Sequence, residues 1–97
     1  MRQFAVHYLF LESIFIYDYF LVNAAELYEK LKVKPVAACL YIEAAQTISH
    51  IDKADAIKAY RKACALYCDI SRFDIAGRIE RKIGDICYNS KHWEEAG

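Results

Sequence analysis

The sequence predicts an all-α fold, an α-solenoid in which antiparallel helical hairpins stack side by side into a twisted layer. The 97-residue chain is 57% apolar yet contains only three glycines and one proline, a composition that favours helices over strands. A block of small and then large residues recurs about every twenty residues. Within each step, apolar residues recur at intervals of three and four, which places them on one face of a helix.

The recurring block sets the size of the repeat. Its copies are AAELY at 24–28, AAQTI at 44–48, ACALY at 63–67 and IGDIC at 83–87. A step of 19 or 20 residues accommodates one helix and one turn, so two steps make a hairpin. Stacked hairpins of this kind form tetratricopeptide-like solenoids, whose usual period is about 34 residues. The double step here, from Ala24 to Ala63, is 39 residues, so we expect longer helices than in an ordinary tetratricopeptide repeat.

The expected helices cover residues 8–31, 35–49, 53–69 and 73–89, and another helix is expected to begin near residue 92. Pro35 suits the first turn of the second helix, because a nitrogen there needs no intrahelical hydrogen bond. Asp52 with Asp55, and Ser71 with Asp74, are expected to cap the N-termini of the third and fourth helices. These residues mark the helix boundaries.

Small and large residues alternate along the expected packing faces. The face of the second helix comprises Ala37, Ala38, Tyr41, Ala44, Ala45 and Ile48. The face of the third helix comprises Ala56, Ile57, Tyr60, Ala63, Cys64 and Tyr67. Small residues at every turn let two helix axes come close, and the large residues fill the grooves between them. These twelve side chains are therefore the predicted core.

The first 22 residues differ from the repeat that follows. They hold seven of the chain's fourteen aromatic residues. Glu12 and Asp18 argue against a membrane span, since an Asp near the centre of a span costs about 2.5–3.5 kcal/mol, and Glu12 also interrupts any secretory signal. We expect an atypical apolar helix over residues 1–22, with a misassigned gene start as the alternative. Helical repeats are expected over residues 23–97, truncated at the C-terminus.

Composition and cysteine spacing exclude several function classes. Thirteen basic and thirteen acidic residues give a net charge of zero. The chain therefore lacks the broad positive field of a nucleic-acid-binding protein. The cysteines are Cys39, Cys64, Cys68 and Cys87. They form no C-x-x-C pair, and His50 and His92 do not complete a metal-ligand pattern. We therefore expect small apolar thiols of the core, in a reducing compartment, and no metal or cofactor. An enzyme based on Cys64 or Cys68 would lack an aligned base.

Short segments in a fixed order connect the chain to a known family. They are the alanine pair at 37–38 with YIEA at 41–44, DAI at 55–57, YCDISRF at 67–73 with IA at 75–76, and GDI at 84–86. In this order, from Asn23 onward, the sequence resembles the soluble NSF attachment proteins, the alpha type in particular. The resemblance implies a cytoplasmic adaptor, peripheral to membranes and not an enzyme. Such an adaptor binds the four-helix bundle of syntaxin-type SNARE proteins and recruits an NSF-type ATPase that separates the bundle.

The resemblance also implies which residues contact the partner. Basic residues on the SNARE-facing surface meet an acidic coil, and Arg72 and Arg78 occupy matching positions. Where alpha-type members have a lysine pair, this chain has Ser49 and His50, so His50 supplies that contact only when protonated. The family's carboxy-terminal, ATPase-contacting half has no counterpart here, so we expect a partial fragment that binds SNAREs weakly.

Charge spacing gives independent support for a basic contact surface. Arg78 and Lys82 lie four residues apart, and like charges at that spacing on a helix repel by a few tenths of a kcal/mol unless an acidic group compensates them. An acidic partner could compensate these charges, or water and salt could screen them. The candidate partner-binding residues are Arg72, Arg78, Lys82 and His50. The alternative is an unrelated helical-repeat scaffold for protein–protein interaction, on which these charges form a solvated face.

Overall fold

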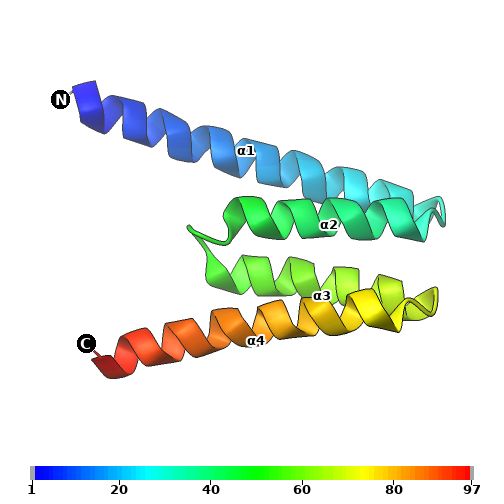
Figure 1. The fold of residues 1–97 in the computed structure, drawn as a ribbon. Coiled ribbons are helices and arrows are strands. Elements are labelled where there is room, and N and C mark those ends of the chain that lie inside the picture. Colours follow the sequence, from blue (N-terminus) through cyan, green and yellow to red (C-terminus); the bar gives the residue numbers. More distant parts are fainter. Residues whose placement is uncertain (1, 97) are drawn as a thin grey trace.

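Four helices make up the computed structural model of the chain. They are α1 (Arg2–Lys30), α2 (Lys34–Ile48), α3 (Lys53–Asp69) and α4 (Phe73–Ala96), shown in Figure 1. The structure describes the backbone of residues 2–96 and the side chains of residues 10–88. Over this backbone there is no strand, which confirms the prediction of an all-α fold built from helical hairpins.

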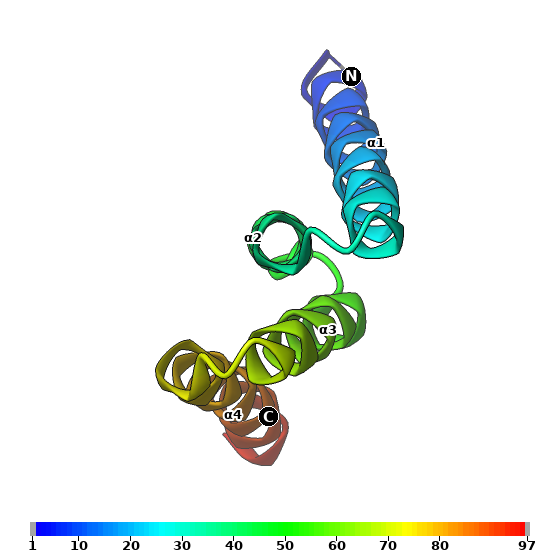
Figure 2. The same ribbon diagram turned by 90° about the vertical axis from the view of Figure 1, so that its right-hand side faces the viewer.

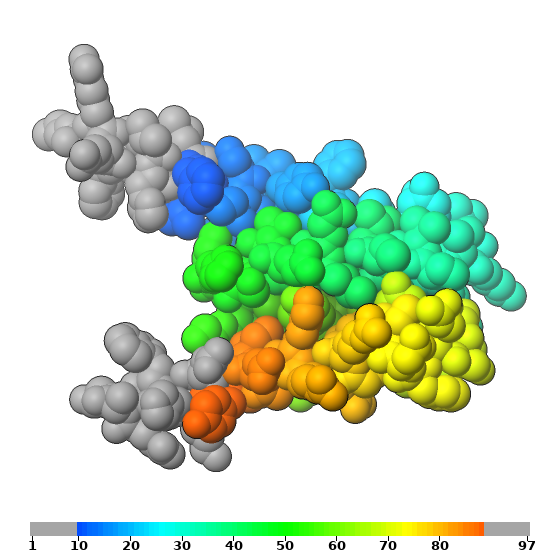
Figure 3. Space-filling view, viewed as in Figure 1, coloured from blue at the N-terminus to red at the C-terminus, as the bar shows by residue number. Residues whose placement is uncertain are grey.

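The helices form a thin layer in which each packs against its neighbour in sequence. The extensive contacts join α1 to α2, α2 to α3 and α3 to α4, and successive helices run in opposite directions (Figure 1). Seen along the helices, α1 and α3 lie to one side and α2 and α4 to the other (Figure 2). The molecule measures 49 × 33 × 14 Å. This is the staggered layer of a solenoid, with α1 and α4 at its two edges (Figure 3).

Alanines and a few large side chains fill the space between the helices. All six predicted packing residues of α2 are buried. In α3, Ala56, Tyr60, Ala63 and Tyr67 are buried as predicted, whereas Ile57 and Cys64 are only partly buried. The predicted face also missed Ala59 and Leu66, which are buried in α3. Close-packed alanines bring the axes together, and buried Tyr41, Tyr60 and Tyr67 fill the grooves between them.

The helix starts largely follow the prediction. Asp52 caps α3, because its side-chain Oδ1 accepts a hydrogen bond from the backbone N–H of Asp55 at 3.2 Å. Pro35 lies in the first turn of α2, where its missing N–H costs nothing. The sequence therefore marks these two starts correctly.

Ser71 does not cap α4, and this prediction was wrong. Its φ is 63°, in the left-handed region, whereas an N-cap residue adopts an extended backbone. The N–H of Ser71 donates to the carbonyl of Cys68 at 3.0 Å and that of Arg72 to the carbonyl of Tyr67 at 2.8 Å. This pair of bonds is a Schellman motif. Ser71 thus ends α3.

The same motif ends α1. Lys32 has a φ of 64°, its N–H donates to the carbonyl of Glu29 at 3.0 Å, and the N–H of Val33 donates to that of Tyr28 at 2.9 Å. Glycine usually occupies the left-handed position because a side chain there is strained. In this chain a lysine and a serine occupy it, so neither helix end is visible as a glycine in the sequence.

Replacing Lys32 with glycine is therefore expected to stabilise the chain by about 1 kcal/mol, since it removes the left-handed strain of a non-glycine residue. Urea denaturation followed by circular dichroism measures the change. Lys30→Gly, at the last residue of α1, is the matched control and is expected to destabilise by up to about 1 kcal/mol. Equal destabilisation by both substitutions would contradict the role assigned to Lys32.

Two predictions about the ends of the chain need correction or extension. No new helix begins near residue 92, because α4 continues to Ala96. Residues 85–96 contain neither glycine nor proline, and Asn89 and Ser90 alone do not stop the helix. At the other end, α1 begins at Arg2 and not near residue 8, and it passes through residues 22 and 23 without interruption, as the expected helix over 8–31 did.

Candidate partner-binding surface

The four predicted contact residues lie in two separate places. His50 lies in the turn between α2 and α3, and Arg72 lies in the turn between α3 and α4. These turns are at opposite ends of the layer (Figure 1). They are joined by the 17-residue α3, which at about 1.5 Å per residue is about 25 Å long. His50 therefore does not share a local cluster with the other three residues.

Arg72 lies in the turn just before α4, and Arg78 and Lys82 lie one turn apart in the first half of that helix. All three side chains are exposed, and together they span about 15 Å at the rise of an α-helix. Buried Ala76 and Ile79 hold α4 against its neighbour. The four-residue spacing places Arg78 and Lys82 on the same side of that buried stripe. We call these three residues the α4 basic row.

The charges of the α4 basic row are only partly compensated within the chain. Arg72 Nε lies 3.5 Å from Asp74 Oδ1, and both side chains are more than half exposed. The pKa of Asp74 is lowered, first by a hydrogen bond from the backbone N–H of Ile75 and then by the charge of Arg72. Within the described side chains, Arg78 and Lys82 form no ion pair. Two of the three positive charges are therefore available to a partner.

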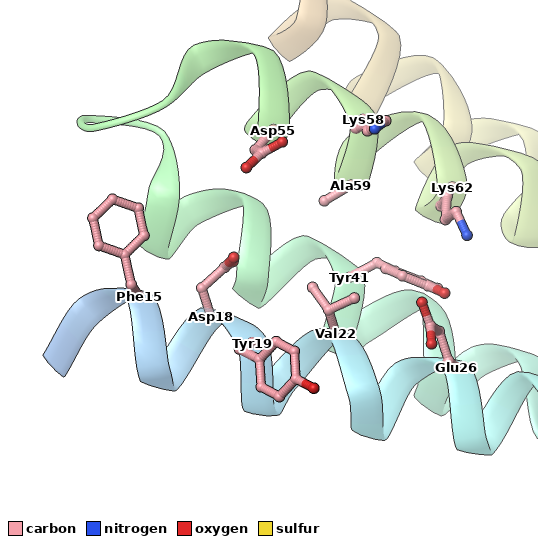
Figure 4. A pocket seen from close by; sticks show the side chains of 10 residues that line it. All are labelled: Phe15, Asp18, Tyr19, Val22, Glu26, Tyr41, Asp55, Lys58, Ala59 and Lys62. Atoms are coloured by element: carbon pink, nitrogen blue, oxygen red, sulfur yellow. The ribbon is translucent and has the colours of Figure 1, made fainter. Parts of the chain in front are cut away.

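A groove that sequence reasoning missed lies between α1 and α3, over α2. Its volume is about 510 Å³. The residues that line it are Phe15, Asp18, Tyr19, Val22, Glu26, Tyr41, Asp55, Lys58, Ala59 and Lys62, shown in Figure 4. The four-residue spacing of Lys58 and Lys62 was visible in the sequence. Their position opposite the acidic residues of α1 required the packing of three helices.

Tyr41 forms the floor of this groove and links the three helices. Its ring is 1% exposed, and Lys62 Nζ from α3 lies 5.5 Å from the ring centroid, within range of a cation–π interaction. The Tyr41 hydroxyl donates to Glu29 Oε1 of α1 at 3.1 Å. Burial, followed by this hydrogen bond, raises the pKa of Tyr41. The groove is thus built on a fixed aromatic centre.

Charges from two helices meet at the end of the groove near Asp18. Burial raises the pKa of Asp18, and the negative charges of Asp55 and then Asp52 raise it further. Lys58 and Lys62 line the α3 wall beyond Asp55 (Figure 4). The groove therefore has mixed charge.

The expectation that the cysteines are core thiols was wrong for three of them, because Cys39, Cys68 and Cys87 are exposed and Cys64 is only partly buried. Cys64 Sγ donates to the carbonyl of Ala76 at 3.6 Å, which ties α3 to α4. Burial raises the pKa of the Cys64 thiol, which makes it a poorer nucleophile because the thiolate is the reactive form. Cys39 Sγ lies 3.3 Å from the Tyr67 hydroxyl. No group of three or more metal-ligating side chains gathers anywhere in the described region.

Comparison with protein families decides the relationship suggested by the sequence segments. Residues 18–97 match the family model for soluble NSF attachment protein, SNAP. The chain belongs to the SNAP family. The match takes in residues 18–22, so the end of the apolar first helix falls within the family region of this SNAP-family chain. No curated protein and no solved structure matched the chain in the corresponding searches.

None of the helices is long and apolar enough to cross a membrane, over the residues that the structure describes.

Proposed function

We propose that this SNAP-family chain is an alpha-type adaptor that binds assembled, syntaxin-type SNARE complexes. It acts in the cytoplasm, peripheral to membranes, where it brings an NSF-type ATPase to the SNARE bundle and catalyses no reaction itself. The observation that supports SNARE binding is the α4 basic row, in which Arg78 and Lys82 are exposed without an ion pair. An acidic coil would complement this row.

The physical reason for a partner lies in the spacing of these charges. Arg78 and Lys82, at i and i+4, repel each other by a few tenths of a kcal/mol on an isolated helix. An acidic surface would turn this repulsion into attraction, and the attraction would weaken as salt screens it. SNAP-family membership favours this partner over the alternative of an unrelated helical-repeat scaffold.

Charge reversal of the row tests the proposal. The double variant Arg72→Glu/Arg78→Glu is expected to weaken binding to an assembled SNARE bundle by about ten- to a hundredfold, because two attractive contacts become repulsive. Binding is measured by co-precipitation and by titration at low and high salt. Raising the salt concentration is expected to weaken SNARE binding by the wild type more than binding by the double variant.

The control is a double reversal with the same change in net charge. Lys53→Glu/Arg61→Glu changes two exposed residues of α3 outside the α4 basic row and is expected to leave binding within about twofold. Equal binding by the row variant and the wild type would exclude the α4 basic row as the contact surface. Equal loss in both variants would show a nonspecific response to net charge.

His50 belongs to a separate contact under this proposal. Because it lies about 25 Å from Arg72 along α3, His50→Ala is expected to add independently to the effect of Arg78→Glu.

Recruitment of the ATPase is tested apart from SNARE binding, by whether the chain raises ATP hydrolysis by an NSF-type hexamer on SNARE complexes.

A further inference from the structure

The groove over α2 has the shape of a site for an elongated ligand. We call it the α1–α3 groove, because α1 and α3 form its walls and Tyr41 of α2 its floor (Figure 4). The α1 wall runs from Phe15 to Glu26, which is about 16 Å or three turns at the rise of an α-helix. On that wall, Phe15 and Tyr19 are 47 and 71% exposed. The groove is therefore open along its length, unlike a pocket that encloses a small molecule.

The directions of the three helices favour a helix as the ligand. α1 and α3 run in the same direction and α2 runs in the opposite one (Figure 1), as in three members of an up-down four-helix bundle. The fourth position of such a bundle lies over the groove, between α1 and α3. A helix antiparallel to both walls completes the alternation, so its C-terminal end lies near Asp18 and Asp55 and its N-terminal end near Lys62.

Uncompensated negative charge collects at one end of the α1–α3 groove. Asp18 on the α1 wall and Asp55 on the α3 wall line this end. The charges of Asp55 and Asp52 add to the effect of burial in raising the pKa of Asp18, which shows that the three carboxylates repel one another. Within the described side chains, none of them forms an ion pair. A cationic side chain between the two walls relieves this repulsion.

The other end of the groove is balanced in charge. Glu26 of α1 and Lys62 of α3 approach the Tyr41 ring from opposite walls (Figure 4). Lys58 lies on the α3 wall between Asp55 and Lys62. Apolar side chains of a ligand suit this part of the groove, where Tyr41 supplies an aromatic floor. An anionic lipid surface is disfavoured, since its headgroups are repelled at the acidic end.

We infer that the α1–α3 groove is a docking site for one amphipathic helix of another protein, which runs antiparallel to α1 and α3. An arginine or lysine in the last turn of that helix lies between Asp18 and Asp55, and apolar residues one and two turns earlier contact Val22 and Tyr41. A basic residue in the last turn also interacts favourably with the dipole of its own helix. The ligand is basic, whereas the partner proposed for the α4 basic row is acidic, and no residue that lines the groove belongs to α4.

Titration of the 97-residue chain with two synthetic peptides tests the inference. Both peptides are alanine-based helices with leucines one and two turns before a residue in the last turn, which is arginine in one peptide and glutamate in the other. The arginine peptide is expected to bind with a micromolar dissociation constant, and the glutamate peptide at least about tenfold more weakly. Amide chemical shifts are expected to change along the groove walls and to stay constant in α4.

Charge reversal in the groove is expected to change which peptide binds better. Asp55→Lys keeps the cap of α3, since Asp52 accepts its hydrogen bond from the backbone N–H of residue 55. Asp55→Lys and Asp18→Lys are each expected to abolish the preference for arginine, because the remaining carboxylate then faces a lysine. The double variant is expected to prefer the glutamate peptide. Asp85→Lys, at an exposed residue of α4, makes the same change outside the groove and is expected to keep the wild-type preference.

Several results would overturn the inference. They are no binding of the arginine peptide at high micromolar concentration, equal binding of the two peptides to the wild type, an unchanged preference in Asp55→Lys, and shift changes centred on α4. Loss of the preference in Asp85→Lys also overturns it, because the response would then follow net charge. No SNARE protein is present in these titrations, so their outcome is independent of the function proposed for the α4 basic row.

Discussion

Replacing Tyr41 with alanine is expected to lower the free energy of unfolding by about 3–5 kcal/mol, which is a large part of the 5–15 kcal/mol that holds a typical domain together. Tyr41 is 1% exposed and lies where α1, α2 and α3 meet. The alanine variant loses the buried ring, the hydrogen bond to Glu29 and the contact with Lys62, and it leaves a cavity among helices that alanines already hold close together.

Urea denaturation at neutral pH measures this loss, and two further variants divide it into parts. Tyr41→Phe keeps the ring and removes only the hydroxyl, so it is expected to cost about 1 kcal/mol. Tyr19→Ala removes an aromatic ring that is 71% exposed from the wall of the same groove and is expected to change stability by less than about 0.5 kcal/mol. If Tyr19→Ala were as damaging as Tyr41→Ala, Tyr41 would not be the centre of packing.

Enlarging Ala63 is also expected to destabilise the fold, in this case by overfilling the core and not by leaving a cavity. Ala63 is completely buried in α3, where a small side chain allows the helix axes to approach. Leucine at this position would force neighbouring side chains out of their preferred rotamers, so Ala63→Leu is expected to destabilise the chain by about 1–3 kcal/mol.

The neighbouring Ala65 gives a matched control for this substitution. It lies two residues away in α3 and is exposed, and alanine and leucine have similar helix propensities. Ala65→Leu is therefore expected to change the free energy of unfolding by less than about 0.5 kcal/mol. Thermal unfolding distinguishes the two variants, since 1 kcal/mol shifts the midpoint by about 4–8 °C in a domain of this size. Equal midpoints would mean that the core tolerates the added volume.

Helical periodicity was sufficient to predict most of the fold. The alanine and tyrosine spacing of α2 identified all its buried residues, because a helix that packs on two neighbours must bury the positions that repeat every three or four residues. The end of α3 was harder, since Ser71 resembles an N-cap in sequence and only its positive φ shows that it terminates a helix. Hydrogen bonds formed across a turn decide between these roles, and local sequence does not record them.

The candidate surface was predictable in part, for a geometric reason. Arg78 and Lys82 share a helix, so their spacing alone placed them together. His50 lies in the loop between α2 and α3, and Arg72 lies in the loop between α3 and α4. In a row of antiparallel helices, consecutive loops lie at opposite ends of the layer, so the order of the helices alone predicts that these two residues are far apart. The groove around Tyr41 depends on how three helices pack together, because Asp18, Tyr41 and Lys62 come from α1, α2 and α3. A linear pattern does not contain that information.

The packing of each helix chiefly against its sequence neighbours has a consequence for how the chain opens. In such a one-dimensional array, stability is a sum of terms for single helices and for adjacent pairs. α2 and α3 each have two flanking helices, whereas α1 and α4 each have one within the described residues. Backbone amide hydrogen exchange is therefore expected to be slowest in α2 and α3 and faster toward both edges, so that the layer opens helix by helix from its sides.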